Sequence, residues 1–137
     1  MRSDHENKLL GIFQASISAV NGQACVQKYL KNQPWSKPTH IIAIGKAASA
    51  MMLGALDHVG KGLQQGLVIT RQGHLDAALK NIPYINCIES MHPVPDISSL
   101  EAGAELIRFI TEAPEYAEFL FLISGGTSSL NEAQAYK

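Results

Sequence analysis

His40-Ile41-Ile42-Ala43-Ile44-Gly45-Lys46-Ala47-Ala48 is the stretch of sequence that decides the fold. Its first five residues form a short apolar run rich in β-branched side chains, which is typical of a strand buried on both faces of a parallel sheet. Gly45-Lys46 predicts a turn, and residues 47–59 are rich in Ala, Met and Leu and predict a helix that ends near Gly60. A buried strand that leads directly into a helix begins a β-α-β unit.

The same alternation continues along the chain. Further strands are expected at residues 67–70, 84–88 and 119–123, with a short helix at residues 75–81. A longer helix is expected before Pro114, capped by Asp96 or Ser98, and its predicted buried face consists of Leu100, Ala104, Ile107 and Ile110. The pattern predicts an α/β fold, a Rossmann-like parallel sheet with helices on both faces.

The N-terminal segment reads as a helix that could cap the sheet. Ser3 and Glu6 have the spacing of a capping box, and one helical face carries Leu9, Phe13, Ile17, Val20 and Ala24. Asn21-Gly22 interrupts the pattern, so two helices or one broken helix are expected. Gln33-Pro34 and Lys37-Pro38 predict a linker before the first strand.

Composition limits the classes of function. The chain has 137 residues, of which 46% are hydrophobic and 17% charged, and its net charge of −1 offers no general attraction to nucleic acid or to an anionic membrane. The N-terminus is polar, and the longest apolar run, residues 119–123, is too short to span a bilayer, so a cytoplasmic protein is expected. Cys25 and Cys87 are expected to be reduced and partly buried, and their spacing predicts no metal site.

Four loops follow the predicted strands, and ligands of such sheets bind at the carboxyl ends of strands. Lys46 lies where a strand turns into a helix, and a cation beside the positive end of a helix dipole costs up to about 1 kcal/mol. The cost is offset if an anion binds between the ammonium and the free backbone N–H groups, and the small residues around Gly45 would let it approach. The alternative is a solvated lysine on a tight turn.

The other three loops also carry groups that suit an anion. Ser124-Gly125-Gly126-Thr127-Ser128 can form a nest of N–H donors around a phosphate, although it could equally be a plain turn, and it is not a Walker A loop. Arg71 ends a strand and can make a forked contact to a carboxylate or phosphate, or lie on the surface. His92, held beside Pro93 and Pro95, could bind an anion or act as acid or base, or be purely structural.

In their order and spacing the four loops resemble one family, the N-terminal domain of type-II glycerate kinases, some of which are labelled hydroxypyruvate reductase. The resemblance covers nearly the whole chain and rests on Gly45-Lys46-Ala47-Ala48, Thr70-Arg71-Gln72-Gly73-His74, His92-Pro93-Val94-Pro95-Asp96 and Ile123-Ser124-Gly125-Gly126. It implies a two-domain enzyme that phosphorylates glycerate to 2-phosphoglycerate with ATP and Mg²⁺ in a cleft between the domains. It further implies that Lys46 is catalytic and that the loop from Ser124 to Ser128 binds phosphate.

The sequence departs from the family in two respects. The family loop reads S-G-G-G-S-A, and here Thr127 replaces the third glycine and Ser129 the alanine, so Thr127 would be strained if that position needs a positive φ. Family members also continue well beyond this loop. Residues 1–137 are therefore expected to be an incomplete N-terminal domain without its C-terminal partner, inactive alone, with an exposed sheet edge that favours a homodimer.

Two alternatives remain open at this stage. The first is a nicotinamide-dependent hydroxypyruvate reductase, which is disfavoured by the absence of G-x-G-x-x-G after the first strand and by Arg71, where NAD enzymes carry an acidic residue. The second is a non-catalytic remnant that binds phosphate or a partner. The sequence leaves undetermined which hydroxy acid is the substrate, the metal ligands, and whether Lys137 is the natural end.

Overall fold

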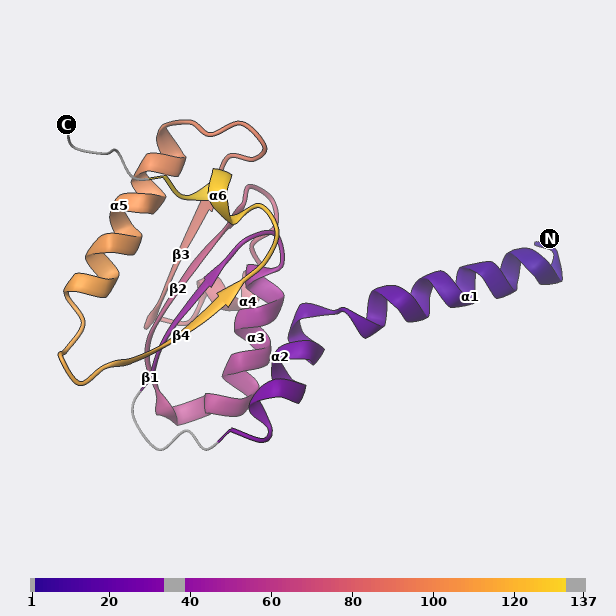
Figure 1. Cartoon of the computed structure of the whole chain (residues 1–137), viewed down its shortest axis with the longest axis horizontal. Coiled ribbons are helices and arrows are strands. Elements are labelled where there is room, and N and C mark those ends of the chain that lie inside the picture. Colours follow the sequence, from indigo (N-terminus) through magenta and orange to yellow (C-terminus); the bar gives the residue numbers. More distant parts are fainter. Residues whose placement is uncertain (1, 34–38, 133–137) are drawn as a thin grey trace.

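The fold is a four-stranded parallel sheet, seen in a computed structural model that describes residues 2–33 and 39–132 (Figure 1). The strands are β1 (Thr39–Ile44), β2 (Leu63–Arg71), β3 (Ile85–Ser90) and β4 (Glu118–Ile123). Their order across the sheet is β3-β2-β1-β4, and all three pairings are parallel. The predicted strands are confirmed, and β2 and β3 extend beyond their predicted ends.

Helices cover both faces of the sheet, as predicted. On one face α3 (Ala48–Val59) packs against β1 and β2, α2 (Gly22–Leu30) packs on α3, and the short helix α4 (Ala77–Lys80) packs on β3. On the other face lie α5 (Ile97–Thr111) and α6 (Thr127–Leu130), and the 3-10 turn Gly60–Gly62 joins α3 to β2. Each face has its own apolar cluster, the first around Ile41 and Met52, the second around Ile42 and Phe109.

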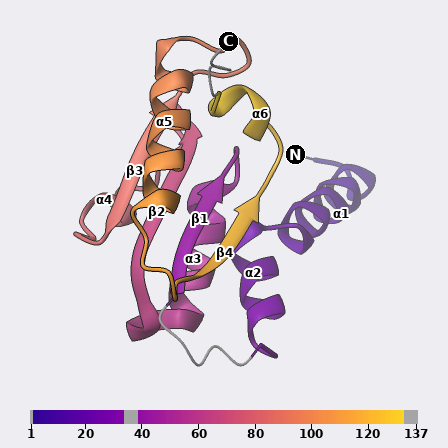
Figure 2. The same cartoon turned by 60° about the vertical axis from the view of Figure 1, so that its left-hand side comes forward.

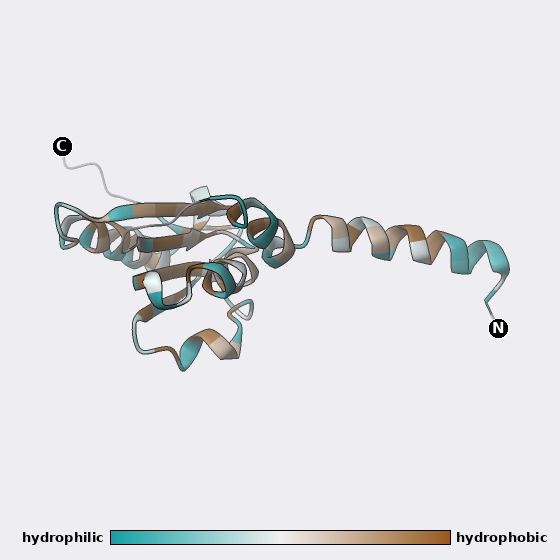
Figure 3. Cartoon of the chain, turned by 90° about the horizontal axis from the view of Figure 1, so that it is seen from below, coloured by the Kyte–Doolittle hydropathy of each residue, from teal (hydrophilic) through white to brown (hydrophobic). Residues whose placement is uncertain are grey.

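The N-terminal segment is two helices, α1 (Asp4–Ala19) and α2, which confirms the break at Asn21-Gly22. Ser3 and Glu6 form the predicted capping box. However, α1 does not cap the sheet: it projects from the body with none of its residues buried, as Figures 1 and 3 show. No single described helix is long and apolar enough to cross a membrane, and only α1 and α2 taken as one pair, bent by 48°, have sufficient length and apolar content.

The buried face of α5 differs from the predicted one. The residues that face the sheet are Ser99, Ala102, Gly103 and Phe109, whereas the predicted face contains Ile107 and Ile110, which are 52% and 38% exposed. Small residues face inward because the chain after α6 approaches closely: a Cβ on Gly103 would overlap the backbone of Glu132. Sequence periodicity selected the largest apolar residues and missed this close backbone approach.

Two further expectations are settled by the described residues. Cys25 is exposed rather than partly buried, whereas Cys87 is half-buried, and both are free thiols. The predicted linker between Gln33 and Pro38 lies almost wholly outside the described residues.

The outer strand β4 is incompletely covered, because α5 packs over β2 and β3 (Figure 2). Phe121 and Ile123 pair in register with Ile42 and Ile44, yet they are 47% and 64% exposed, while their partners on β1 are buried. The described structure thus leaves one edge and part of one face of the sheet bare.

Candidate anion-binding site at the carboxyl edge of the sheet

The turns after β1 and β4 lie side by side. The chain passes from β1 to β2 on one side and later returns to β4 on the other side of β1, so the two turns flank the point where the connections diverge. Ligands of open α/β sheets bind at such points. The backbone N–H of Lys46 donates to the carbonyl oxygen of Gly125 at 3.0 Å, and the N–H of Ala47 donates to Ser124 Oγ at 3.0 Å. The Ser124 N–H donates to the Ile44 carbonyl at 2.9 Å.

Gly45 makes this close approach possible. Its φ is +119°, a conformation that other residues rarely adopt, and a Cβ would lie 2.6 Å from the Ser124 carbonyl oxygen. The buried side chain of Thr70, at the end of β2, also fixes the turn: its hydroxyl donates a hydrogen bond to the Gly45 carbonyl at 3.0 Å. Sequence analysis placed Thr70 in a motif but gave it no role, although a hydroxyl at the end of a buried strand must find a partner.

Thr127 is not strained. Gly126 takes the positive φ, +92°, and Thr127 begins α6, while no described residue other than glycine has a positive φ. The Thr127 hydroxyl donates to the carbonyls of Ser124 at 2.7 Å and Ile44 at 3.2 Å. The departure from the family's third glycine is therefore accommodated by a side chain that ties the two turns together.

In the 124–128 loop, the side-chain hydroxyls of Ser124 and Thr127 form hydrogen bonds within the protein, whereas most of the backbone N–H groups form none among the described residues. Ser124 Oγ accepts from Ala47 and makes a longer contact of 3.4 Å to the Ile44 carbonyl, so, like that of Thr127, its hydroxyl braces the turns. By contrast, the N–H groups of Gly125, Gly126, Thr127 and Ser128 have no acceptor among residues 2–33 and 39–132. Any anion held by this loop would be bound by its backbone, with the exposed Ser128 hydroxyl at its rim.

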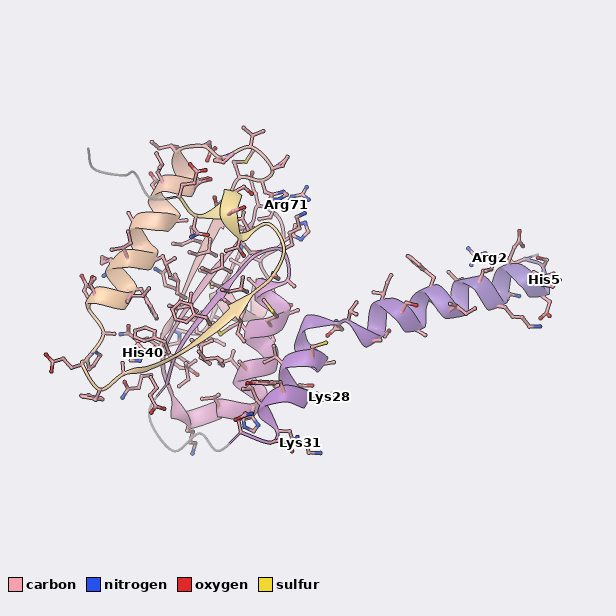
Figure 4. All side chains as sticks on the ribbon, in the orientation of Figure 1. Arg2, His5, Lys28, Lys31, His40 and Arg71 are labelled. Carbon is pink, nitrogen blue, oxygen red and sulfur yellow. The ribbon has the colours of Figure 1, made fainter. Side chains whose placement is uncertain are left out.

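Lys46, Arg71 and His92 meet at the same edge, and we call these three residues the cation cluster. A Cβ on Gly126 would lie 3.0 Å from His92 Cδ2 and Nε2 and 3.4 Å from Lys46 Cε, so the imidazole and the end of the lysine side chain lie on the same side of Gly126. Arg71 and His92 line one shallow hollow together, and Figure 4 shows Arg71 at this edge of the sheet. Partial burial, and then the charges of Lys46 and Arg71, lower the pKa of His92.

Carboxylates do not pair with the lysine or the arginine of the cluster. Three nearby carboxylates each accept a hydrogen bond of 2.7–2.9 Å from a backbone N–H: Asp76, Glu89 and Asp96. Within the described part of the chain, neither Lys46 nor Arg71 forms an ion pair with a carboxylate. The edge therefore combines uncompensated positive charge with unpartnered N–H donors, which together favour an anion.

Ser49, a residue that sequence analysis missed, shapes a second hollow at the start of α3. Its hydroxyl donates to the His74 carbonyl at 3.0 Å and accepts from the Asp76 N–H at 3.2 Å, which fixes the loop after β2 on the first turn of α3. Lys46 and Ala50 line this hollow together with that loop. A serine in the first turn of a helix is the only sequence signal for this contact.

The geometry defines a class of protein: a Rossmann-like α/β domain with a candidate anion site at the point where its strand order reverses. The particular family follows from comparison with known proteins. Residues 8–137 match the sequence profile of the family described as "Domain of unknown function (DUF4147)", and the chain belongs to that family. The resemblance to the N-terminal domain of type-II glycerate kinases is confirmed.

Three relatives show the extent of the likeness. The chain is 31% identical over 121 residues to D-glycerate 2-kinase of Thermotoga maritima, covering 88% of this chain and 28% of that protein. It is 41% identical over 91 residues to an Agrobacterium vitis protein with the provisional name hydroxypyruvate reductase, covering 66% of this chain and 22% of that protein. The crystal structure of glycerate kinase from Thermotoga maritima superimposes with a TM-score of 0.82 at 31% identity, covering 96% of this chain and 31% of that chain.

The chain thus spans about a quarter to a third of the length of the relatives that it matches. The described residues contain no group of three or more histidine, cysteine or acidic side chains placed to hold a metal ion. The carboxylates of Glu89 and Asp96 accept hydrogen bonds from the backbone N–H groups of Gly73 and Ser98.

Proposed function

We propose that this chain supplies the phosphate-binding wall of a glycerate kinase, which transfers the γ-phosphoryl group of ATP to glycerate and forms 2-phosphoglycerate. The observation that carries the proposal is the meeting of Lys46 with the Gly125-Gly126 turn at the boundary of β1 and β4. The relatives named glycerate 2-kinase and glycerate kinase supply the reaction. The chain supplies a place where negatively charged oxygen is stabilised.

Lys46 is the proposed catalytic residue. In the transfer, a glycerate hydroxyl oxygen forms a bond to the γ-phosphorus, the bond to the ADP oxygen breaks, and the hydroxyl proton leaves to a base. Phosphoryl transfer depends mainly on positioning and on electrostatic stabilisation of the phosphoryl oxygens. A lysine with no carboxylate partner in the described structure, fixed through its own backbone N–H to Gly125, meets both needs.

The remaining proposed binding groups surround the ammonium. Gly45 lets the two turns approach, and the N–H groups from Gly125 to Ser128 offer a nest for a phosphate. We assign phosphate or substrate contacts to the loop residues Ser124, Gly125, Gly126, Thr127 and Ser128, with Ser124 and Thr127 acting through the backbone that their hydroxyls brace. Arg71 and His92 would bind the substrate carboxylate or phosphate from the other side of the hollow.

The resemblance to glycerate kinases implies that the reaction uses Mg²⁺ as well as ATP. Near the cation cluster the described structure gathers no group of three or more histidine, cysteine or acidic side chains that could hold the ion. We therefore assign no metal ligand in this chain and derive no step through the ion.

The alternative of a hydride-transferring reductase has less support. A dinucleotide fold presents the N–H groups of its first β-α turn to the pyrophosphate. Here the N–H groups of Lys46 and Ala47 are already bonded to Gly125 and Ser124, and the turn lacks the glycine pattern. A non-catalytic chain that only binds phosphate would use the same groups.

We further propose that a second domain, corresponding to the part of the Thermotoga chain that this chain does not span, closes the open hollow. Without such closure the bare edge of β4 favours self-association into a homodimer. The free thiols of Cys25 and Cys87 support a reducing, cytoplasmic location.

Titration of the chain with ATP and with 2-phosphoglycerate tests the proposal. Both anions are expected to bind, and Lys46→Met is expected to weaken each by tenfold or more, while Lys61→Met, an exposed lysine in the turn that precedes β2, changes little. A coupled assay of the chain alone is expected to show no glycerate-dependent ATP turnover. Equal binding by Lys46→Met would contradict the site, and NADPH binding that persists in the presence of ATP would favour the reductase.

A further inference from the structure

The cation cluster contains one group, the His92 imidazole, whose charge depends on pH. Lysine and arginine side chains are ordinarily cationic at physiological pH, whereas an imidazole gains or loses its charge in that range. His92 lies near both Lys46 and Arg71. Its imidazole lies over Gly126 beside the end of the Lys46 side chain, and it lines a hollow together with Arg71. The charges that act on His92 are those of Lys46 and Arg71, while Glu89 accepts from the Gly73 N–H and Asp96 caps α5.

We propose that His92 is a proton-linked anion ligand, so that binding of an anion at the cation cluster is accompanied by uptake of a proton on His92. The inference rests on the proposed anion site and adds its regulation by pH. Without a bound anion, the positive charges of Lys46 and Arg71 oppose a third positive charge on His92. A bound dianion reverses the sign of the local field, and the imidazolium then becomes a third donor to it.

The environment of His92 agrees with this geometry. Partial burial and the charges of Lys46 and Arg71 lower the pKa of its imidazole, so protonation is disfavoured in the absence of an anion. An anion at the cluster offsets both charges and raises that pKa. The two effects are thermodynamically linked: if a bound anion raises the proton affinity of His92, protonation of His92 raises the anion affinity by the same factor. Anion binding must therefore tighten as the pH falls and His92 becomes protonated.

Gly126 is what allows the imidazole and the lysine to share the anion. A methyl group at this position would press on both His92 and Lys46 Cε, at 3.0 and 3.4 Å. The turn after β4 itself contributes no titratable group, so the titratable groups of the cation cluster come from the ends of β1, β2 and β3 and the loops after them. His74, on the loop after β2, is an imidazole that lines the hollow at the start of α3 together with Lys46.

Sulfate is the appropriate probe, because its charge is constant from about pH 5 to pH 8 and any pH dependence belongs to the protein. Sulfate affinity of the chain is measured by calorimetry at pH 5.5 and pH 7.5, and the His92 imidazole resonance is titrated by NMR with and without saturating sulfate. We expect about three- to tenfold tighter binding at pH 5.5, and a higher His92 pKa with sulfate bound. His92→Gln should bind sulfate with little pH dependence, and His74→Gln should keep the dependence.

The possible results are distinct. If Lys46→Met loses sulfate binding but the wild-type affinity is equal at both pH values, the inference is wrong and the anion site stands. The inference is also wrong if His74→Gln, rather than His92→Gln, removes the pH dependence. If sulfate fails to bind, or binds equally well to Lys46→Met, the anion site itself is wrong and the inference falls with it.

Discussion

The backbone N–H of Lys46 donates a hydrogen bond of 3.0 Å to the carbonyl oxygen of Gly125, which joins the first β-α turn to the loop after β4. The two residues are remote in sequence and adjacent because β1 and β4 pair in register up to Ile44 and Ile123. The bond fixes the backbone that carries the ammonium relative to the backbone that carries the free N–H groups. The proposed chemistry depends on this relationship.

Substitution of the two adjacent glycines should have unequal effects. Gly126→Ala places a side chain at φ +92° and against His92, so we expect a loss of roughly 1–2 kcal/mol in stability and weaker sulfate binding. Gly125→Ala enters open space at an ordinary φ, and its stability should change by no more than about 0.5 kcal/mol. Urea unfolding of both variants measures the difference, and equal losses would show that the turn is not held as described.

A second glycine pair tests the packing of α2 on α3. Gly54 lies in α3, where a Cβ would lie 2.9 Å from the Gln23 Cα and overlap its carbonyl, so Gly54→Ala should destabilise the body by about 1–3 kcal/mol. Gly11 lies in the projecting helix α1 with nothing within 4 Å. Gly11→Ala should leave the unfolding midpoint unchanged and raise the helix content, because alanine favours a helix by roughly 0.5–1 kcal/mol. A tolerated Gly54→Ala would contradict the close approach of α2 to α3.

His40 should make stability depend on pH. It is buried beside the rings of Phe109 and Phe119, at centroid distances of 5.9 and 5.5 Å, and its Nδ1 has no hydrogen-bond partner among the described residues. Burial lowers the pKa of its imidazole, so below the unfolded value of about 6.5 the unfolded chain binds a proton that the folded chain resists. Stability is therefore full above that pH and falls as the pH decreases, by up to about 1.4 kcal/mol per unit.

Chemical denaturation between pH 5 and pH 7.5 checks the His40 prediction. The slope should be smaller in His40→Phe, while His58→Gln, at an exposed position of α3, should keep the wild-type slope. The comparison uses slopes, so a constant change in stability caused by the larger ring does not affect it. An unchanged slope in His40→Phe would assign the acid sensitivity to other groups.

The bare edge of the sheet should drive self-association. Phe121 and Ile123 expose apolar surface on the outer strand, and an unpaired strand edge is a template for pairing with another chain. Light scattering at increasing concentration should show a dimer of the wild-type chain, and Phe121→Thr with Ile123→Thr should shift it to the monomer. Tyr116→Thr, which removes an exposed ring outside the strand, is the control. A wild-type chain that stays monomeric at high concentration would contradict this account.

The strands, the helix caps and the direction of the sheet could be predicted because they depend on local patterns. The run from His40 to Ile44 is apolar enough to be buried on both faces, and Asp96 caps α5 as its position suggested. The buried face of α5 could not be predicted, because it is set by a long-range backbone contact at Gly103 that leaves no periodic signal.

The sequence predicted which loops form the candidate site but not how their side chains and backbone groups are arranged. The sequence indicated that Lys46 and the Ser124–Thr127 turn would share one edge, which follows from parallel strands alone. The sequence could not predict which glycine of the turn has the positive φ or which hydroxyls point inward. Both depend on the register of β1 with β4. Ser49 and Thr70 were missed because each hydroxyl bonds to a carbonyl 25 residues away in the sequence.

The most direct test is an NMR titration of the ¹⁵N-labelled chain with sulfate at pH 6, repeated with Lys46→Met and Lys61→Met. The account predicts that the amide resonances of Gly125, Gly126, Thr127 and Ser128 shift together in the wild type and in Lys61→Met, and that Lys46→Met weakens the response by tenfold or more. Shifts confined to other parts of the chain, or an undiminished response in Lys46→Met, would contradict an anion site built from these two turns.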